Sequence, residues 1–265
     1  MKKVGIIQFP GSNCEYETRD AVRAVNLDSE IIAWNSSESD LDSYDAFILP
    51  GGFSFQDRVR AGVVSSRLPV INYLKKVSLE GKPILGICNG CQILAESGII
   101  PSYDEQSISM ALAPNMANNE TIGFVCDWVY VKIENPENSV FTSAFSKDDV
   151  LPIQINHGEG NFKFKNKDQI QSSSLTKIKY CSDQGIIDSS YPVNPNGSDL
   201  NVAGISNEKG NVMAIMPHPE RGVSWFHVPR YLNHNSAAMR RRNSLKEGPW
   251  LPFFVSLANY LKGNQ

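Results

Sequence analysis

The sequence predicts an α/β fold, a flavodoxin-like and mostly parallel sheet flanked by helices. In residues 1–100, short apolar runs alternate with amphipathic stretches, the pattern of parallel strands joined by covering helices. The chain has 265 residues, 41% of them hydrophobic, which is enough to bury a full core. Such folds place their functional sites at the carboxyl ends of the strands.

The first part of the chain alternates strand and helix. Gly11 and Pro50 interrupt the pattern after apolar runs, and Gly98 is expected to end a helix in a left-handed conformation. We expect buried strands at Val4–Phe9, Glu30–Trp34, Ala46–Leu49 and Pro83–Ile87, and helices at Glu15–Val25, Pro69–Val77 and Gln92–Ser97.

The second part is richer in strands. The segment Tyr191–Ser198 is turn-forming and is expected to be a surface loop, and Trp250–Leu261 is expected to be a closing helix. No repeat or linker divides the chain, so we expect a single domain over residues 1–265 with an extended arm at about 222–249. Strands are expected at Trp128–Ile133, Val150–Ile155, Ile178–Cys181, Val202–Ser206 and Val212–Met216.

Composition limits the partners and the compartment. The formal net charge of -3 gives no general attraction to nucleic acid or to a membrane surface. The apolar run at Val4–Ile7 is too short for a signal peptide, and no stretch reaches the roughly 18 apolar residues of a membrane span. The five scattered cysteines favour a reducing compartment, so we expect a cytoplasmic protein.

Cys88 is the candidate nucleophile. Gly86, Cys88 and Gly90 lie where a buried strand runs into a helix, the cysteine counterpart of the Gly-x-Ser-x-Gly elbow that thrusts its central residue outward. The amino terminus of a helix favours negative charge and therefore the thiolate. The backbone amide of Asn89 would point at an oxyanion formed on attack.

Other roles for Cys88 stay open. It could be a small buried apolar residue, the commoner fate of a single cysteine. Cys88 and Cys91 also form a Cys-x-x-Cys pair that could be redox-active or half a zinc site. No second pair exists, because Cys14, Cys126 and Cys181 stand alone, so the sequence gives little support to a structural metal site.

His218 and Glu220 are the candidate base and its orienting carboxylate. His218 follows an apolar strand and lies between Pro217 and Pro219, which favour extended backbone. Residues two apart on an extended segment point the same way, so the carboxylate can reach the imidazole. The alternative is a histidine at a strand end beside a glutamate in a surface ion pair.

Gly52 is the second candidate oxyanion donor. It belongs to a glycine loop that follows the strand Ala46–Leu49, and such a loop can expose its amides. Glycine pairs are also common in plain turns, so this interpretation depends on the cysteine elbow.

Taken together, these segments resemble the class I (triad-type) glutamine amidotransferases, and more narrowly the glutaminase subunits of phosphoribosylformylglycinamidine synthase. The elbow and the triad specify only the amidotransferase superfamily, whereas His157–Gly160 and Asn194–Ser198 narrow the resemblance to the glutaminase subunit of this synthase. The matching stretches are Phe9–Cys14, Leu49–Ser54, Arg60–Gly62, Gly86–Gln92, His157–Gly160, Asn194–Ser198, Ala203–Ile205 and Met216–Arg221.

The resemblance implies a mechanism and a division of labour. Cys88 would attack the side-chain amide of glutamine, His218 would protonate the leaving ammonia, and water would hydrolyse the thioester. Gln92 and the backbone around His157 and Gly158 would hold the amino-acid end of glutamine, although His157 could instead be structural. Ammonia would pass to a synthetase subunit that uses ATP and magnesium to amidate formylglycinamide ribonucleotide in purine biosynthesis.

The resemblance also implies a small accessory subunit, and no cofactor or metal in this chain. A Gly-x-x-x-x-Gly-Lys-Ser/Thr loop is absent from the sequence, which agrees with ATP chemistry in the partner. Gln56 stands where the family usually has glycine, which puts the behaviour of that loop in doubt. The arm, with Arg240–Arg242, could dock onto the synthetase or be a solvated basic face.

Three other functions remain possible at the level of sequence. The first is an ammonia-supplying subunit of another synthetase, and the second is a non-enzymatic redox or stress module that uses Cys88 and Cys91. The third is a protease on the same scaffold, which would make the glutamine-loop residues coincidental.

Overall fold

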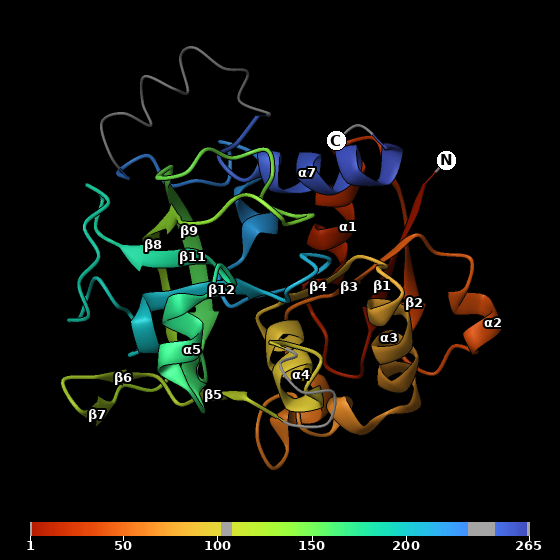
Figure 1. Ribbon diagram of the computed structural model, residues 1–265, viewed down its shortest axis with the longest axis horizontal. Coiled ribbons are helices and arrows are strands. Elements are labelled where there is room, and N and C mark those ends of the chain that lie inside the picture. Colours follow the sequence, from red (N-terminus) through yellow and green to blue (C-terminus); the bar gives the residue numbers. More distant parts are fainter. Residues whose placement is uncertain (1, 102–107, 233–246, 264–265) are drawn as a thin grey trace.

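A nine-stranded sheet runs through the molecule, in the order β2-β1-β3-β4-β13-β12-β11-β8-β9 (Figure 1). The computed structural model describes residues 2–101, 108–232 and 247–263. The strands of this sheet are β1 (Lys3–Gln8), β2 (Asp28–Ala33), β3 (Ala46–Leu49), β4 (Ile84–Ile87), β8 (Val125–Ile133), β9 (Val150–His157), β11 (Thr176–Cys181), β12 (Val202–Ser206) and β13 (Val212–Ile215).

The sheet is parallel in one half and antiparallel in the other. β2, β1, β3, β4 and β13 pair in parallel, whereas β12, β11, β8 and β9 continue the sheet in antiparallel pairs. Every residue of β3, β4 and β13 is buried, as expected of central strands covered on both faces. The predicted fold class is confirmed, and the antiparallel half is built by the strand-rich second part of the chain.

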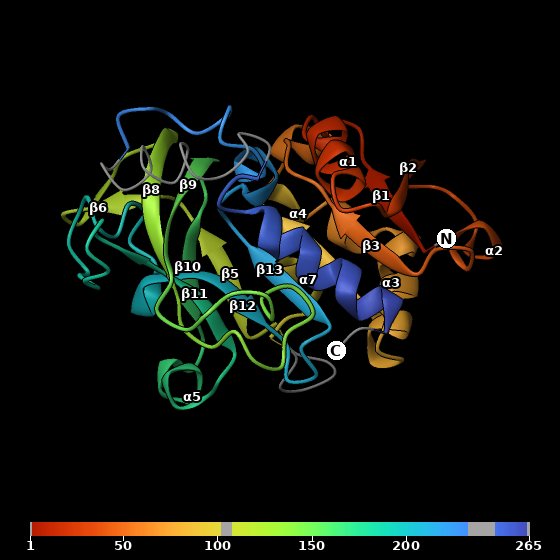
Figure 2. The same ribbon diagram turned by 90° about the horizontal axis from the view of Figure 1, so that it is seen from above.

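Helices cover both faces of the parallel half (Figures 1 and 2). Helices α1 and α7 lie on one face, and α3 and α4 lie on the other. The described helices are α1 (Glu15–Arg23), α2 (Glu38–Leu41), α3 (Pro69–Leu79), α4 (Asn89–Ser97), α5 (Lys167–Ser172) and α7 (Leu251–Lys262). Gly98 ends α4 in the left-handed conformation, as the sequence predicts.

The structure contains short elements that the sequence analysis did not predict. The strands β5 (Met110–Ala113) and β10 (Asn161–Phe164) pair with each other outside the main sheet, and so do β6 (Met116–Ala117) and β7 (Glu120–Thr121). Each is four residues or fewer, too short to show a periodic pattern in the sequence.

The segment Tyr191–Ser198 is not the surface loop that its turn residues predict. Tyr191 and Pro192 are exposed, but Asn194, Asn196 and Ser198 are buried. The Asn194 Oδ1 atom accepts hydrogen bonds from the backbone of Gly197 and Ser198, at 3.0 and 3.1 Å. The asparagine side chain thus satisfies buried backbone groups that a strand or a helix would otherwise satisfy.

The closing helix α7 is anchored by a buried tryptophan. Trp250 precedes the helix, is fully buried, and donates from Nε1 to the carbonyl of Pro152 on β9, at 2.8 Å. Of the predicted arm at about 222–249, residues 233–246, and with them Arg240–Arg242, lie outside the described residues. Trp225, Val228 and Leu232 form a small apolar cluster against Trp128 and Tyr130 of β8.

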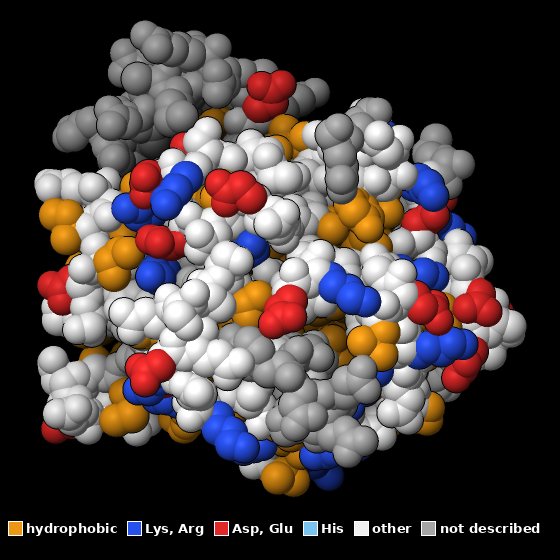
Figure 3. Space-filling view, viewed as in Figure 1, with side chains coloured by type: hydrophobic (Ala, Val, Ile, Leu, Met, Phe, Trp, Pro, Cys, Tyr) orange, Lys and Arg blue, Asp and Glu red, His pale blue; other side chains and the backbone are white. Residues whose placement is uncertain are grey.

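The visible surface carries charges of both signs. Figure 3 shows acidic and basic side chains interspersed over the face seen in Figure 1, in keeping with the small formal net charge of -3. Within residues 2–101, 108–232 and 247–263, no helix has the length and apolar character needed to cross a membrane.

Candidate active site

Cys88 occupies a strained bend between β4 and α4. Its φ of 51° and ψ of -104° lie outside the common regions for a residue with a side chain. A Cβ added at Gly86 would lie 2.5 Å from the Gly90 carbonyl oxygen, and one added at Gly90 would overlap the carbonyl of Leu49 on β3. The two glycines therefore allow the tight approach of strand and helix that the elbow pattern predicts.

His218 lies beside this bend because β4 and β13 are parallel neighbours. Ile87 at the end of β4 is in register with Ile215 at the end of β13, so the residues that follow the two strands emerge at the same edge of the sheet. The backbone N–H of His218 donates to the carbonyl of Gln154 on β9, at 2.9 Å, which fixes this segment against the antiparallel half.

The imidazole of His218 is buried and directed by a carboxylate. Its Nδ1 atom lies 2.5 Å from Oε1 of Glu220, and the two residues are 1% and 2% exposed. The opposite ring atom, Nε2, is buried and has no hydrogen-bond partner among the described residues. With Nδ1 held as the donor to the carboxylate, Nε2 is left to exchange a proton.

Electrostatics favour the charged form of this histidine. Burial by itself would lower the pKa of His218, but the Glu220 carboxylate and the neighbouring Cys88 sulfur raise it well above its usual value. A Cys–His pair whose imidazole accepts a proton readily is the arrangement that activates a thiol nucleophile. The Cys88 thiol itself is 5% exposed and donates to the Asn156 carbonyl at 3.6 Å.

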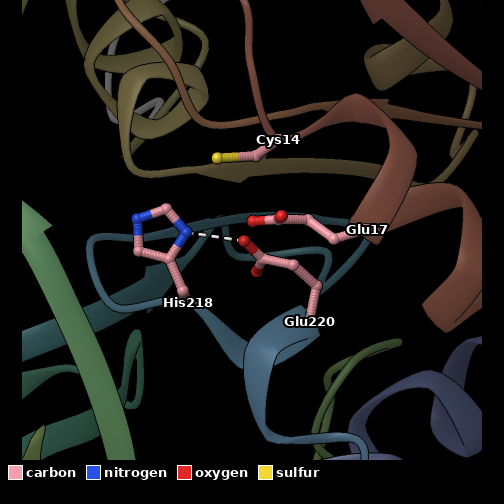
Figure 4. A group of neighbouring side chains, drawn as sticks. All are labelled: Cys14, Glu17, His218 and Glu220. Atoms are coloured by element: carbon pink, nitrogen blue, oxygen red, sulfur yellow. Dashed lines mark hydrogen bonds and ion pairs between the residues drawn. The ribbon is translucent and has the colours of Figure 1, made fainter. Parts of the chain in front are cut away.

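Cys14, which directly precedes α1, and Glu17, in its first turn, form a cluster with His218 and Glu220 (Figure 4). One ligand-type atom from each of the four lies within 4.8 Å of the others. Arg221 reaches into this cluster and donates from Nε to Glu17 at 2.7 Å and from Nη2 to the Cys14 sulfur at 3.4 Å. A side-chain cation is therefore already bound to two of the four members of the cluster.

A small cavity of ≈ 120 Å³ opens beside Cys88. The predicted residues Gly52, Gln92, His157 and Gly158 line it together with the nucleophile. His218, Glu220 and Asn89 are buried beside this cavity and do not belong to its lining. The remaining lining residues are Phe53, Asp57, Ala61, Phe124, Asn156 and Glu159.

Asn89 and Gln92 tie the glycine loop to helix α4. The Asn89 side chain accepts from the backbone N–H of Ser54 at 3.1 Å and donates to Asp57 and Gln92, at 3.2 and 2.9 Å. Gln92 in turn donates to the carbonyl of Glu159, at 2.7 Å. Through Asn89 and Gln92 of α4, this network links Asp57 in the glycine loop to the backbone of Glu159. Both of these residues line the cavity.

The glycine loop adopts a conformation that residues with side chains rarely take. Phe55, Gln56, Asp57 and Val59 all have positive φ, between 50° and 75°. Gln56, with a φ of 61°, thus stands in a left-handed position where the glycine usual for the family would fit without strain. Clustered strain of this kind is typical of functional sites.

His157 is neutral and rigidly held. Its Nδ1 atom lies 3.0 Å from Asn115 Oδ1, and because the Asn115 amide nitrogen donates to two backbone carbonyls, that oxygen is the acceptor and Nδ1 the donor. Burial, followed by the neighbouring His218, lowers the pKa of His157 to about 3. The Nε2 atom is left as a buried acceptor without a partner among the described residues.

The Cys88–Cys91 pair is poorly suited to redox chemistry. All five cysteines of the chain are free, and Cys91 is fully buried. Burial, followed by the neighbouring Cys88, raises the pKa of the Cys91 thiol well above its usual value. A resolving cysteine needs access and thiolate character, and Cys91 has neither.

The structure thus brings all eight predicted site residues to one region, and it adds residues that the sequence analysis did not assign. Cys14 interacts with His218, Asn115 with His157, and Arg221 with Cys14, while Asp57 and Glu159 line the cavity. Cys14 and Glu159 lie inside stretches that match the family, but their sequence positions gave no sign of a role beside the triad.

Comparison with known proteins decides the family. The profile of the CobB/CobQ-like glutamine amidotransferase domain matches residues 1–261. The chain is 43% identical over 234 residues to the phosphoribosylformylglycinamidine synthase subunit PurQ of Methanothrix thermoacetophila, covering 86% of this chain and 89% of that one. The chain belongs to the glutamine amidotransferase family. Within it, the chain groups with the glutaminase subunits of phosphoribosylformylglycinamidine synthase, as its motifs predict.

Further relatives support this placement of the amidotransferase. The PurQ subunit of Aquifex aeolicus is 40% identical over 222 residues, which cover 83% of this chain and 90% of that one. Among solved structures, PurLQS from Thermotoga maritima matches with a TM-score of 0.72 and 30% identity, covering 98% of this chain and 99% of that chain. The glutaminase domain of Trypanosoma brucei CTPS, at 11% identity and a TM-score of 0.58, shares the fold.

Proposed function

We propose that this amidotransferase hydrolyses glutamine through a thioester on Cys88 and supplies ammonia for the amidation of formylglycinamide ribonucleotide. The observation that carries the proposal is the meeting of the strained Cys88 bend with the His218–Glu220 pair at the ends of adjacent parallel strands. The relatives that match over most of the chain are subunits of the synthase that performs this amidation.

The first half-reaction forms the thioester. The Cys88 thiol gives its proton to Nε2 of His218, and the sulfur attacks the side-chain amide carbon of glutamine. Negative charge develops on the amide oxygen, where the backbone N–H groups of Gly52 and Asn89 are the proposed donors. The C–N bond then breaks, and ammonia leaves with the proton that His218 had accepted.

The second half-reaction releases glutamate. Water attacks the thioester carbon while His218 takes one of its protons, and the same two donors stabilise the second oxyanion. The C–S bond breaks, the Cys88 thiolate is protonated, and glutamate leaves. The Glu220 carboxylate accepts from Nδ1 of His218 and stabilises the imidazolium that forms in both steps. In this scheme Gln92 and the backbone of His157 and Gly158 hold the amino-acid end of the substrate.

The same comparison supports a proposal about the partners. The structural relative is PurLQS from T. maritima, and we infer that this chain works with a synthetase subunit and a small accessory subunit. ATP and magnesium would act in the synthetase, and this chain would contribute no cofactor.

The arm at residues 222–249 is a proposed docking element for the synthetase. If deletion of residues 233–246 leaves complex formation unchanged, the arm does not have that role. The five free cysteines support a cytoplasmic location.

Cys88→Ala, assayed in complex with the synthetase subunit, tests the catalytic proposal. We expect the variant to lose glutamine-dependent synthesis and to keep ammonia-dependent synthesis, because only the first needs the thioester. Cys126→Ala is the matched control, since Cys126 is exposed and lies outside the cavity. Loss of both activities in the Cys88 variant, or loss of neither, would overturn the assignment. A partner from another ammonia-using synthetase should give no amidated product.

A further inference from the structure

The glycine loop after β3 is held against the turn that connects β1 to α1. Ser12 of this turn, which spans residues 10–14, and Gly52 of the loop form an isolated antiparallel bridge. A Cβ added at Gly52 would lie 2.7 Å from the Cα atom of Ser12, and one added at Gly11 would lie 2.2 Å from the carbonyl oxygen of Phe53. Both glycines have positive φ, 149° at Gly52 and 96° at Gly11. The two segments approach so closely only because these positions carry no side chain.

Two backbone donors of the 10–14 turn hold the carbonyl of Gly51. The N–H groups of Asn13 and Cys14 donate to its oxygen, at 3.3 and 3.2 Å. The peptide between Gly51 and Gly52 is trans and planar, so its C=O and its N–H point in opposite directions. Because the carbonyl faces the 10–14 turn, the N–H of Gly52 faces away from it.

The N–H of Gly52 is free to donate. Within residues 2–101, 108–232 and 247–263, no group accepts a hydrogen bond from it. The bridge gives it the same direction as the peptide plane does, since in a bridge pair of this type the N–H and C=O of each paired residue point away from the partner. Gly52 lines the cavity together with Cys88. A free N–H in a cavity beside a nucleophile is the donor that an oxyanion needs.

The 10–14 turn is anchored at both of its ends. At the first end, the N–H of Ser12 donates to the Phe9 carbonyl at 2.9 Å, and the Ser12 hydroxyl accepts from the Phe9 N–H at 3.0 Å. At the second end, the carbonyl of Cys14 accepts from the N–H and the hydroxyl of Thr18, at 3.0 and 2.7 Å. These contacts join the turn to β1 and α1, so it offers its donors from a fixed position.

The catalytic base encloses Gly51 from another direction. A Cβ added at Gly51 would lie 2.8 Å from Cε1 of His218 and 3.0 Å from the sulfur of Cys14. The imidazole and the thiol therefore leave little room for this peptide to rotate. The same packing sets the distance between the oxyanion donor and the base.

We propose that the 10–14 turn is a positioning element of the glutaminase reaction, which fixes the Gly51–Gly52 peptide with its N–H directed at the oxyanion. Reversal of this peptide would break both hydrogen bonds to the Gly51 carbonyl. It would also bring that carbonyl oxygen to the cavity, where it would repel the developing negative charge. The inference rests on the proposed function and adds to it the residues that set the direction of one oxyanion donor.

Gly11→Ala tests the positioning role from outside the cavity. The added Cβ would collide with the Phe53 carbonyl and part the bridge, so the Gly52 donor would be misdirected. We expect kcat for glutamine, measured in complex with the synthetase subunit, to fall about 10²-fold with little change in KM, the cost of one oxyanion donor. Gly81→Ala is the matched control and should keep its kcat, because Gly81 has a φ of 94° but a Cβ there would meet nothing within 4 Å.

Alkylation of Cys88 by iodoacetamide separates positioning from general damage to the site. The sulfur displaces iodide from a CH₂ group and the thiol proton passes to His218, so this step needs the nucleophile and the base but no oxyanion donor. We expect Gly11→Ala to be alkylated at Cys88 as fast as the unmodified protein, measured by mass spectrometry of the labelled peptide. Equal falls in kcat and in alkylation rate would overturn the positioning role, and so would an unchanged kcat.

Asn13→Pro carries the same test if Gly11→Ala does not fold. It removes one of the two N–H donors to the Gly51 carbonyl and leaves the glycines in place, and we expect the same split between kcat and alkylation rate. Thermal unfolding, monitored by circular dichroism, checks that each variant is assayed as folded protein. An unchanged kcat in folded variants removes only the role of the 10–14 turn. If the unmodified enzyme does not turn over glutamine in its complex, the proposed function itself fails.

Discussion

Nδ1 of His218 and Oε1 of Glu220 lie 2.5 Å apart inside the protein. They lie at the edge of the sheet where the chain bends at Cys88, between β4 and α4. The distance is typical of a strong, charge-assisted hydrogen bond. Since the carboxylate raises the pKa of His218, the pair is a coupled base and not merely two buried polar groups.

We expect Glu220→Gln to reduce glutamine hydrolysis by about 10²–10⁴-fold with little change in KM. The amide oxygen can still accept from Nδ1, so the ring orientation is kept, but the imidazolium loses its countercharge. Steady-state kinetics on the complex with the synthetase subunit measures the effect, and ammonia-dependent synthesis is the internal control. A loss confined to KM would contradict the orienting role.

The same variant should show a pH-dependent loss of stability. A histidine whose folded-state pKa is raised contributes stability that is fully present below its unfolded pKa of about 6.5 and is lost as pH rises through the higher folded value. Glu220→Gln removes this contribution, so its destabilisation should be larger at pH 6 than in alkaline solution. Urea unfolding across this range measures the trend, and a constant difference would argue against it.

Asp57→Asn should make the free protein more stable near pH 7.5. The folded state holds the pKa of Asp57 at about 6, above the ordinary value of 3.8, so ionisation is harder in the folded protein and stability falls as pH rises from about 4 to 6. After allowance for solvent screening, we expect a gain of about 1 kcal/mol at pH 7.5 that narrows toward pH 4. A gain that does not vary with pH would point to another cause.

Gln56→Gly should stabilise the glycine loop. The side chain at φ 61° is held in the left-handed region, and glycine removes that strain, worth up to about 1 kcal/mol. The hydrogen bonds between Gln56 and Arg58 are exposed and contribute little. Gln56→Ala is the matched control, because alanine loses the same polar contact but keeps the Cβ. In chemical denaturation, the Gln56→Gly variant should have a larger free energy of unfolding than the unmodified protein. Equal stability of the Gln56→Gly and Gln56→Ala variants would contradict strain relief.

The sequence predicts the triad well because its signals are local. The glycines that flank Cys88 mark the elbow, and the prolines around His218 impose the extended backbone that carries Glu220 to the ring. The adjacency of the two segments followed from a general rule, since parallel strands deliver their carboxyl ends to one edge of the sheet.

The parts that the sequence did not predict depend on contacts between distant segments. Cys14 meets Arg221 from 207 positions away, and Ala61 meets Glu159 from 98 positions away. Neither partner shows a periodicity or a turn signal that marks the contact. The burial of the loop at Asn194–Ser198 was not predicted for a related reason. Turn-forming residues indicate the conformation of the backbone but not whether it is buried.

The closeness of Gly90 to β3 leads to a prediction about folding. A Cβ at this position would overlap the backbone carbonyl of Leu49, a fully buried residue on the interior strand β3. We therefore expect Gly90→Ala to cost about 3 kcal/mol or more and to prevent stable folding. Gly158→Ala is the control for cavity glycines, because its Cβ would meet only Phe124, at 3.7 Å, and should fold normally. Thermal unfolding compares the two, and a Gly90 variant that melts within a few degrees of the unmodified protein would show that strand and helix can separate without loss of the elbow.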